Sequence, residues 1–194
     1  MLRAYRGGHM YLLLNTVDTI CVRYHLHGTS RYGVEVLRVY PVVEWSDLGV
    51  TATFEEDAGG GSNAATTVVV FARHPGGFVL AAIPGRGWCT PSGHIEPHET
   101  HLDAALRETR EEIGAELRDV RIIGRFLLTN SSGVRSAAIA FVGRVDTFGD
   151  LPAHTEATAV RVVPPEDLPS VYYRWDELLS RVFAYAERLL AAIP

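Results

Sequence analysis

The 194-residue chain carries a formal net charge of −5, and all 18 of its basic residues are arginines. Hydrophobic residues make up 47% and charged residues 21% of the chain, which is the composition of a folded globular protein and excludes a largely disordered one. The acidic balance and the lack of a basic run disfavour nucleic acid as a partner.

Cysteine usage and apolar runs bear on the compartment in which the protein works. Cys21 and Cys89 are too few for a disulfide framework and lack the spacing of a metal site. The longest early apolar run, residues 10–14, is too short to span a bilayer, and no cleavable signal pattern follows it. We therefore expect a cytoplasmic protein with no membrane partner.

Residues 1–56 are expected to form a β-rich N-terminal extension. Apolar and polar residues alternate over 20–27, β-branched residues are frequent over 34–43, and 50–54 offers a third short strand. A three-stranded meander of this size buries little core by itself. We expect it to act as a homodimerisation arm, with a lid over the substrate or additional core as the alternatives.

A polar, glycine-rich stretch over residues 57–64 is expected to be a linker, which leaves residues 65–194 as one compact domain. The domain opens with a hairpin, because strands over 66–72 and 78–83 flank the turn signal His-Pro-Gly-Gly. A polar loop then leads to the most informative part of the chain.

A helix is predicted at residues 100–113. Thr100 and Asp103 can form a capping box at its start, and Gly114 supplies the left-handed residue that ends it. A mostly apolar stripe that can pack on a sheet consists of Leu102, Leu106, Thr109 and Ile113.

The same helix carries three carboxylates within one turn. Glu108, Glu111 and Glu112 stand at i, i+3 and i+4, so their repulsion costs free energy unless a cation lies among them. Carboxylates that face a loop carbonyl suit a hard cation such as Mg²⁺, with Mn²⁺ as a substitute. Such a cation neutralises phosphate charge and orients or acidifies an attacking water. For the glutamates taken alone, a solvated helix face is the alternative.

The stretch 93–115 resembles the signature of the Nudix hydrolase family, G-x5-E-x7-R-E-U-x-E-E-x-G-U, in which U is aliphatic. The fixed positions are occupied by Gly93, Glu99, Arg107, Glu108, Glu111, Glu112 and Gly114. Thr109 and Ala115 replace two aliphatic residues, and Ser92 stands where glycine is common; these changes leave the carboxylates in place. The resemblance implies a pyrophosphohydrolase that uses a divalent metal to act on a nucleoside diphosphate linked to another group.

The resemblance also implies which residues bind the metal. Glu108, Glu111 and Glu112 would bind it together with the backbone carbonyl of Ser92. Glu156 resembles the additional acidic ligand or base that family members often place outside the signature, with an exposed surface glutamate as the alternative.

Two further members of the catalytic motif, Arg107 and Glu99, are expected to hold it together. Arg107 can pair with Glu99 across the loop or with Asp103 one turn earlier, which makes it a structural clamp. The three histidines of the same loop could also suggest a zinc site, but three histidines in one loop are more often solvated. These residues are His94, His98 and His101.

Several side chains outside the motif are candidates for substrate contacts. Arg86 and Arg125 are suited to phosphates, and the rings of Trp88, Tyr172 and Tyr173 are suited to stacking on a base. A structural role is the alternative for each of them.

The remaining elements complete the expected fold. Strands are predicted over 120–129, 136–146 and 159–163, and an amphipathic helix over 171–192 is predicted to cover the sheet. The order of elements resembles the Nudix α/β/α sandwich, an α/β (α+β) fold with a mixed sheet between helices.

The substrate class follows from what is missing after the signature. No secondary family signature points to ADP-ribose, dinucleoside polyphosphates or NADH. We therefore expect a nucleoside triphosphate, oxidised ones included, to be cleaved to a monophosphate and pyrophosphate. ADP-ribose, nucleotide sugars and dinucleotides stay as alternatives, as do an isomerase on the same fold and a non-catalytic nucleotide sensor. The sensor is disfavoured because the extension contains no helix-turn-helix pattern.

Overall fold

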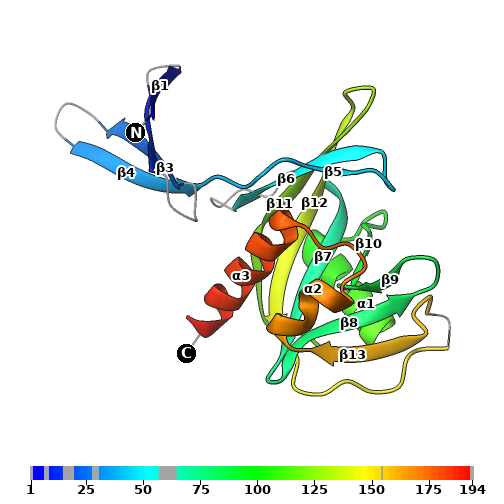
Figure 1. Cartoon of the computed structure of the whole chain (residues 1–194). Coiled ribbons are helices and arrows are strands. Elements are labelled where there is room, and N and C mark those ends of the chain that lie inside the picture. The colour runs from blue at the N-terminus through cyan, green and yellow to red at the C-terminus, as the bar shows by residue number, and fades with distance from the viewer. Residues whose placement is uncertain are drawn as a thin grey trace. The chain divides into compact units, whose positions relative to one another are not determined.

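The computed structural model describes residues 2–6, 9–14, 20–27, 31–56, 65–153 and 155–192, with side chains described from residue 38 onward. The chain divides into two compact units, Met1–Pro41 and Val42–Pro194 (Figure 1). Within the described residues, no helix combines the length and the apolarity that crossing a bilayer requires.

The N-terminal unit is a four-stranded antiparallel meander in the order β1-β2-β3-β4. Its strands are β1 (Leu2–Arg6), β2 (His9–Leu14), β3 (Ile20–His27) and β4 (Arg31–Arg38). The strand expected over 20–27 is β3. The strand expected over 34–43 begins earlier and ends at Arg38, three residues before a proline that has no N–H for a ladder.

The second unit contains a nine-stranded mixed sheet in the order β13-β8-β7-β12-β11-β6-β5, with β10 added beside β7 and β9 beside β8. Strands β7 and β12 run parallel, and the other pairs are antiparallel. The strands are β5 (Val43–Trp45), β6 (Val50–Glu56), β7 (Ala65–His74), β8 (Gly77–Ile83), β9 (Gly87–Cys89), β10 (Ser92–His94), β11 (Arg118–Asn130), β12 (Arg135–Arg144) and β13 (Ala159–Val163).

The N-terminal extension is shorter than expected. Strand β6, expected as the third strand of a separate meander, pairs along its whole length with β11 and so belongs to the main sheet. The boundary therefore lies near Pro41 and not at residue 56. Alternation along a strand predicts its faces but does not identify its partner strand, which explains the error. Residues 57–64, the expected linker, lie outside the described residues.

The sheet lies between two helices, which confirms the expected sandwich (Figure 1). Helix α1 (His101–Ile113) packs with Val68 and Val70 of β7 in one hydrophobic core. Phe71 points to the other face, where its ring lies 4.8 Å from that of Phe183 in α3 (Glu177–Ala191). The strand alternation thus gives each helix its own apolar surface.

The C-terminal helix begins later than expected. A 3₁₀ turn (Pro165–Asp167) and the short α2 (Leu168–Val171) come first, and α3 starts only after Asp176, whose Oδ1 accepts a hydrogen bond of 2.8 Å from Leu179 N. The preceding segment 172–175 is mostly aromatic and continues the stripe in the sequence at Trp175, yet it is extended at Tyr172. The N-cap carboxylate therefore sets the boundary that the apolar pattern hides.

Candidate active site

Helix α1 is fixed at both ends by the predicted caps. Thr100 Oγ1 accepts a hydrogen bond from Asp103 N, and Thr100 N donates to Asp103 Oδ2, each at 3.1 Å. Gly114 ends the helix at φ 62°. Asp103 serves the cap, so the alternative pairing of Asp103 with Arg107 is not the one seen. The caps fix the two ends of α1, and thereby the position of the turn with the three glutamates relative to the preceding loop.

Strand β10 crosses the helix at the glutamate turn with very little space. A Cβ atom added to Gly93 would lie 1.9 Å from Glu108 Oε1 and 2.2 Å from its carboxyl carbon. A larger residue at this position would therefore displace the carboxyl group of Glu108, which lies directly against the backbone of β10.

The backbone of β10 also presents polar groups to the helix. The residues on either side of the strand, Pro91 and Ile95, make ladder hydrogen bonds to β7 at 2.8 and 3.0 Å. Because such bonds alternate along an antiparallel strand, Ser92 and His94 direct their N–H and C=O groups away from β7. Ser92 N donates to Glu112 Oε2 at 2.9 Å. The carbonyl expected to bind a metal thus comes from a residue already held next to Glu112.

Arg107 joins the loop to the glutamates. Its Nε and Nη2 bind both carboxylate oxygens of Glu99 at 2.9 and 3.1 Å, and Nη2 also donates to His94 O at 2.9 Å. Nη1 contacts Glu108 at 2.7 Å and Glu111 at 3.2 Å. The ion pair with Glu99 is the one expected of a clamp. In addition, the guanidinium neutralises two of the three carboxylates.

Burial shapes the charges of the glutamate turn. Glu108 and Glu112 are 7% and 8% exposed. Burial, followed by the charges of Glu108 and Glu156, raises the pKa of Glu112 to about 7, against opposing effects of Ser92 N–H and Arg86. Burial also raises the pKa of Glu108, although Arg107 counteracts part of this effect. Arg107 thus compensates Glu108 in part, whereas buried Glu112 is left with a deficit of charge compensation that a cation can provide.

The donors fit a hard divalent cation in chemistry but are not gathered around one point. Within the described residues, no three His, Cys, Asp or Glu side chains are arranged to hold a metal, and this includes the three loop histidines. All the donors proposed for the ion are oxygens, as Mg²⁺ prefers. Since Arg107 binds Glu108 and Glu111, these two side chains would exchange the guanidinium for the cation on loading.

A pocket of about 280 Å³ lies beside β10. Its lining includes Ser92, Gly93 and His94 of β10, and Phe126 and Leu128 of β11. The pocket therefore begins at the residues that face the glutamates and continues over the sheet. Its apolar and aromatic lining with a few polar groups is typical of a small-molecule site.

The predicted substrate residues divide between this pocket and other places. Arg86, Tyr172 and Tyr173 line it. Trp88 is absent from its lining, and Arg125 instead pairs with Glu55 at 2.7 Å beside a different cavity. Tyr172 is fixed by a 2.9 Å hydrogen bond between its hydroxyl and Thr90 Oγ1 and by ring contacts with Tyr173, Trp175 and Phe183, so its role includes packing.

Trp45 and Arg174 are among the pocket residues that the sequence analysis did not identify as site residues. Trp45 comes from β5 and Arg174 from the segment before α3, and both line the pocket. Trp45 lay in the segment assigned to the extension, and Arg174 lay inside the expected helix. The acidic residue at the start of α3, Asp176, was the local signal that could have excluded Arg174 from that helix.

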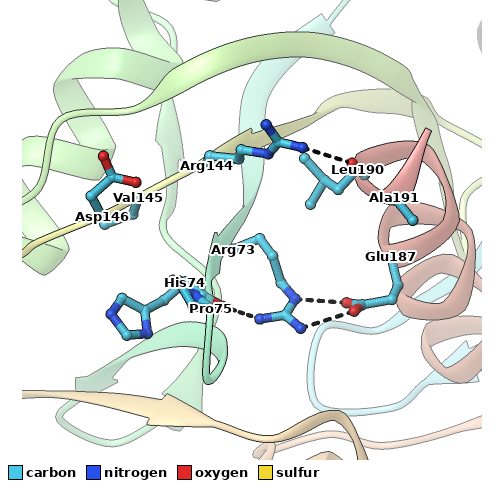
Figure 2. A pocket seen from close by; sticks show the side chains of 9 residues that line it. All are labelled: Arg73, His74, Pro75, Arg144, Val145, Asp146, Glu187, Leu190 and Ala191. Carbon is cyan, nitrogen blue, oxygen red and sulfur yellow. Dashed lines mark hydrogen bonds and ion pairs between the residues drawn. The ribbon is translucent and has the colours of Figure 1, made fainter. Parts of the chain in front are cut away.

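A second cavity, of about 230 Å³, lies where α3 meets β7 and β12. Figure 2 shows its two arginines pointing at acceptors from α3: Arg73 forms a bidentate pair with Glu187 at 2.8 and 2.9 Å, and Arg144 donates to Leu190 O at 3.1 Å. Glu187 neutralises the charge of Arg73, so this cavity is poorly suited to an anion. It is better described as a packing defect between α3 and the sheet.

Comparisons with known proteins agree with this geometry. A family model described as the NUDIX domain matches residues 62–184. The asymmetrical bis(5′-nucleosyl)-tetraphosphatase of Mus musculus is 51% identical over 39 residues, which are 20% of this chain and 26% of that protein. YtkD of Bacillus subtilis, by name a candidate 8-oxo-dGTP diphosphatase, is 37% identical over 59 residues, which are 30% of this chain and 37% of that protein. The chain thus matches well under half the length of these relatives.

Similarity of fold extends further than similarity of sequence. The crystal structure of the Bacillus subtilis pyrophosphohydrolase BsRppH superposes with a TM-score of 0.62 over 75% of this chain and 94% of that chain, at 19% identity. At this identity the likeness concerns the fold.

Proposed function

The chain belongs to the NUDIX-domain family, and from this premise we propose that it hydrolyses the diphosphate linkage of a nucleoside diphosphate derivative with Mg²⁺. The proposed substrate is a nucleoside triphosphate, oxidised ones included, and the products are a monophosphate and pyrophosphate. The observation that carries the proposal is the pair of buried carboxylates, Glu108 and Glu112, on one helical turn against β10 and beside a nucleotide-sized pocket.

The residues of the glutamate turn would hold the metal. Glu112 lies against Ser92 through the backbone N–H, and Glu108 lies against Gly93, so two carboxylates and the Ser92 carbonyl are near one another. Glu111 is the more exposed carboxylate, with 51% of its side chain accessible, and would complete the donor set. A bound Mg²⁺ supplies charge neutralisation for the diphosphate and an acidified water.

Arg86 is the residue proposed to position the phosphates. It lines the pocket, and its charge acts on Glu112, so it stands within electrostatic reach of the glutamate turn. A guanidinium binds phosphate oxygens through paired N–H groups. Glu156 acts on Glu112 through charge, which supports its proposed role as a nearby additional acid.

The proposal is tested by measuring pyrophosphate and phosphate release from a nucleotide panel with Mg²⁺ or Mn²⁺. Glu112→Gln is expected to reduce kcat by more than the roughly 10- to 100-fold that groups behind metal ligands cost. Glu116→Gln is the matched control, because Glu116 is 72% exposed in its side chain and pairs only with Arg110 among the described residues. Full Mg²⁺-dependent activity in Glu112→Gln would show that the site is wrongly assigned. Tight nucleotide binding without products would support the sensor instead.

We also propose that the N-terminal unit is a homodimerisation arm and that the protein works in the cytoplasm without nucleic acid. A lone four-stranded meander has little apolar volume to share between its faces. Residues 1–41 are the segment to delete, since β5 and β6 belong to the main sheet. Light scattering should then report a change from dimer to monomer, and an unchanged mass would dismiss the arm.

A further inference from the structure

The pocket has a wall formed by an arginine held between two aromatic rings. The guanidinium carbon of Arg174 lies 4.7 Å from the ring centroid of Trp45 and 4.8 Å from that of Tyr173. Its side chain is only 13% exposed, and an ion pair connects it to Asp47. These contacts hold a cation at the pocket wall in a nearly dry environment.

This wall is fixed by hydrogen bonds from both sides. Trp45 Nε1 donates to Asp176 Oδ2 at 2.7 Å, and the other oxygen of Asp176 caps α3. Tyr173 N donates to Trp88 O at 2.9 Å. A guanidinium on such a frame has lost most of its side-chain freedom before a ligand arrives, and this lowers the entropic cost of using it for recognition.

Arg174 uses only a small part of its hydrogen-bond donors within the described residues. A guanidinium has five N–H donors. Among the described residues, Asp47 is its single hydrogen-bond acceptor, through one Nη. Ring contacts use the positive charge but accept no conventional hydrogen bond. No nitrogen of Arg174 is among the fully buried unpaired side-chain atoms of the described residues, so its remaining N–H groups stay accessible to a ligand that enters the pocket.

The charge of the lining favours an acceptor-rich ligand. The charged side chains that line the pocket in the described part of the chain are Arg86 and Arg174, and no carboxylate is among the lining residues. Arg86 interacts with Glu112 at the metal end, whereas Arg174 belongs to the aromatic wall formed with Trp45. The two arginines therefore stand at different parts of the pocket.

We propose that Arg174 selects guanine among nucleobases by donating to its O6 and N7 atoms. This inference rests on the proposed function and names the base of its substrate. The planar fork of arginine matches the adjacent O6 and N7 acceptors of guanine. Adenine presents an amino group in place of O6, so one donor of Arg174 would meet another donor. Arg174 therefore lowers the affinity for adenine through this donor–donor contact, in addition to raising the affinity for guanine.

The experiment compares guanine and adenine nucleotides by binding and by turnover. Isothermal titration with GDP and ADP should show a preference for GDP of roughly 10- to 100-fold, and kcat/KM for GTP over ATP should show a similar ratio. Inosine nucleotides keep both acceptors and should behave like guanine. Nucleotides of 7-deazaguanine lack N7, and those of 8-oxoguanine carry a hydrogen there, so both should bind more weakly than guanine.

Variants separate recognition from support of the wall. In Arg174→Gln the ratio of guanine to adenine affinity should fall towards one, and Arg174→Lys should restore charge without restoring the ratio, because the lysine lacks the fork. Asp47→Asn is the matched control: it breaks the ion pair but keeps the guanidinium, and so should keep the preference. Equal losses for guanine and adenine in Arg174→Gln, or the same loss in Asp47→Asn, would mean that Arg174 only supports the wall.

Failure of this inference and failure of the proposed function give different results. Equal hydrolysis of GTP and ATP by the wild type would overturn the guanine preference and leave the pyrophosphohydrolase intact. Selective binding of GDP without hydrolysis of any nucleotide would do the opposite. If Arg174→Gln does not fold, the series of inosine and 7-deazaguanine nucleotides on the wild-type protein still decides the question.

Discussion

The substitution Gly93→Ala tests whether the close approach of β10 to Glu108 positions the metal ligands. The new methyl carbon would lie 1.9 Å from Glu108 Oε1, far inside any tolerated contact, so the carboxyl group must swing away. In doing so it loses the 2.7 Å ion pair to Arg107. Overpacking of this kind costs about 1–3 kcal/mol. For a chain of this size each kcal/mol lowers the unfolding midpoint by about 2–4 °C.

The larger effect of Gly93→Ala should be on metal loading. We expect the Mg²⁺ concentration for half-maximal activity to rise roughly tenfold or more, because one ligand has been turned away from the site. Thermal unfolding and a Mg²⁺ titration of pyrophosphate release measure the two effects separately. Gly149→Ala is the control, since a Cβ there has one neighbour, 3.8 Å away. A Gly93→Ala protein with wild-type Mg²⁺ dependence would refute the reasoning.

Further predictions concern charge and capping. The pKa of Glu112 is raised to about 7 from an ordinary 4.5, so folding favours its protonated form. Without metal, this contribution to the free energy of unfolding is at most about 3 kcal/mol; it is present below pH 4.5 and is lost as the pH rises through about 7. Unfolding in EDTA across pH 4–8 would measure the loss. The stabilisation by Mg²⁺ should grow over the same range, because the cation binds the ionised carboxylate. Arg107→Met leaves buried Glu108 unpaired and should cost about 2–4 kcal/mol in chemical unfolding, whereas Arg110→Met, at an exposed pair, should cost less than about 1 kcal/mol. Asp176→Ala removes the cap of α3 and should cost about 1–2 kcal/mol in the same assay.

Features encoded by neighbouring residues could be predicted from the sequence. The limits of α1 follow from Thr100, Asp103 and Gly114, which act within one turn of the helix ends, and the structure confirms both caps. The pairing of Arg107 with Glu99 follows in the same way from a short loop. In each case the interacting residues are close in sequence, so spacing alone restricts the geometry.

Features that join distant segments could not be predicted in this way. Trp45 bonds Asp176 across 131 positions, and no local pattern pairs a tryptophan in one short strand with a particular carboxylate. Strand β6 showed its alternation in the sequence, but its partner β11 is found only when the whole sheet is assembled. The pocket wall depends on both long-range contacts, so the place of Arg174 in it could not be predicted, although Asp176 was a local signal that the helix begins after it.

The bond between Trp45 and Asp176 also has a consequence for biosynthesis. The glutamate helix is complete by Ile113, long before the residues that close the pocket have left the ribosome. The turn proposed to bind the metal is therefore synthesised early, whereas the pocket can be completed only near the end of translation. Completion of the pocket thus requires that the second unit has been assembled in full, from its first strand to its last helix.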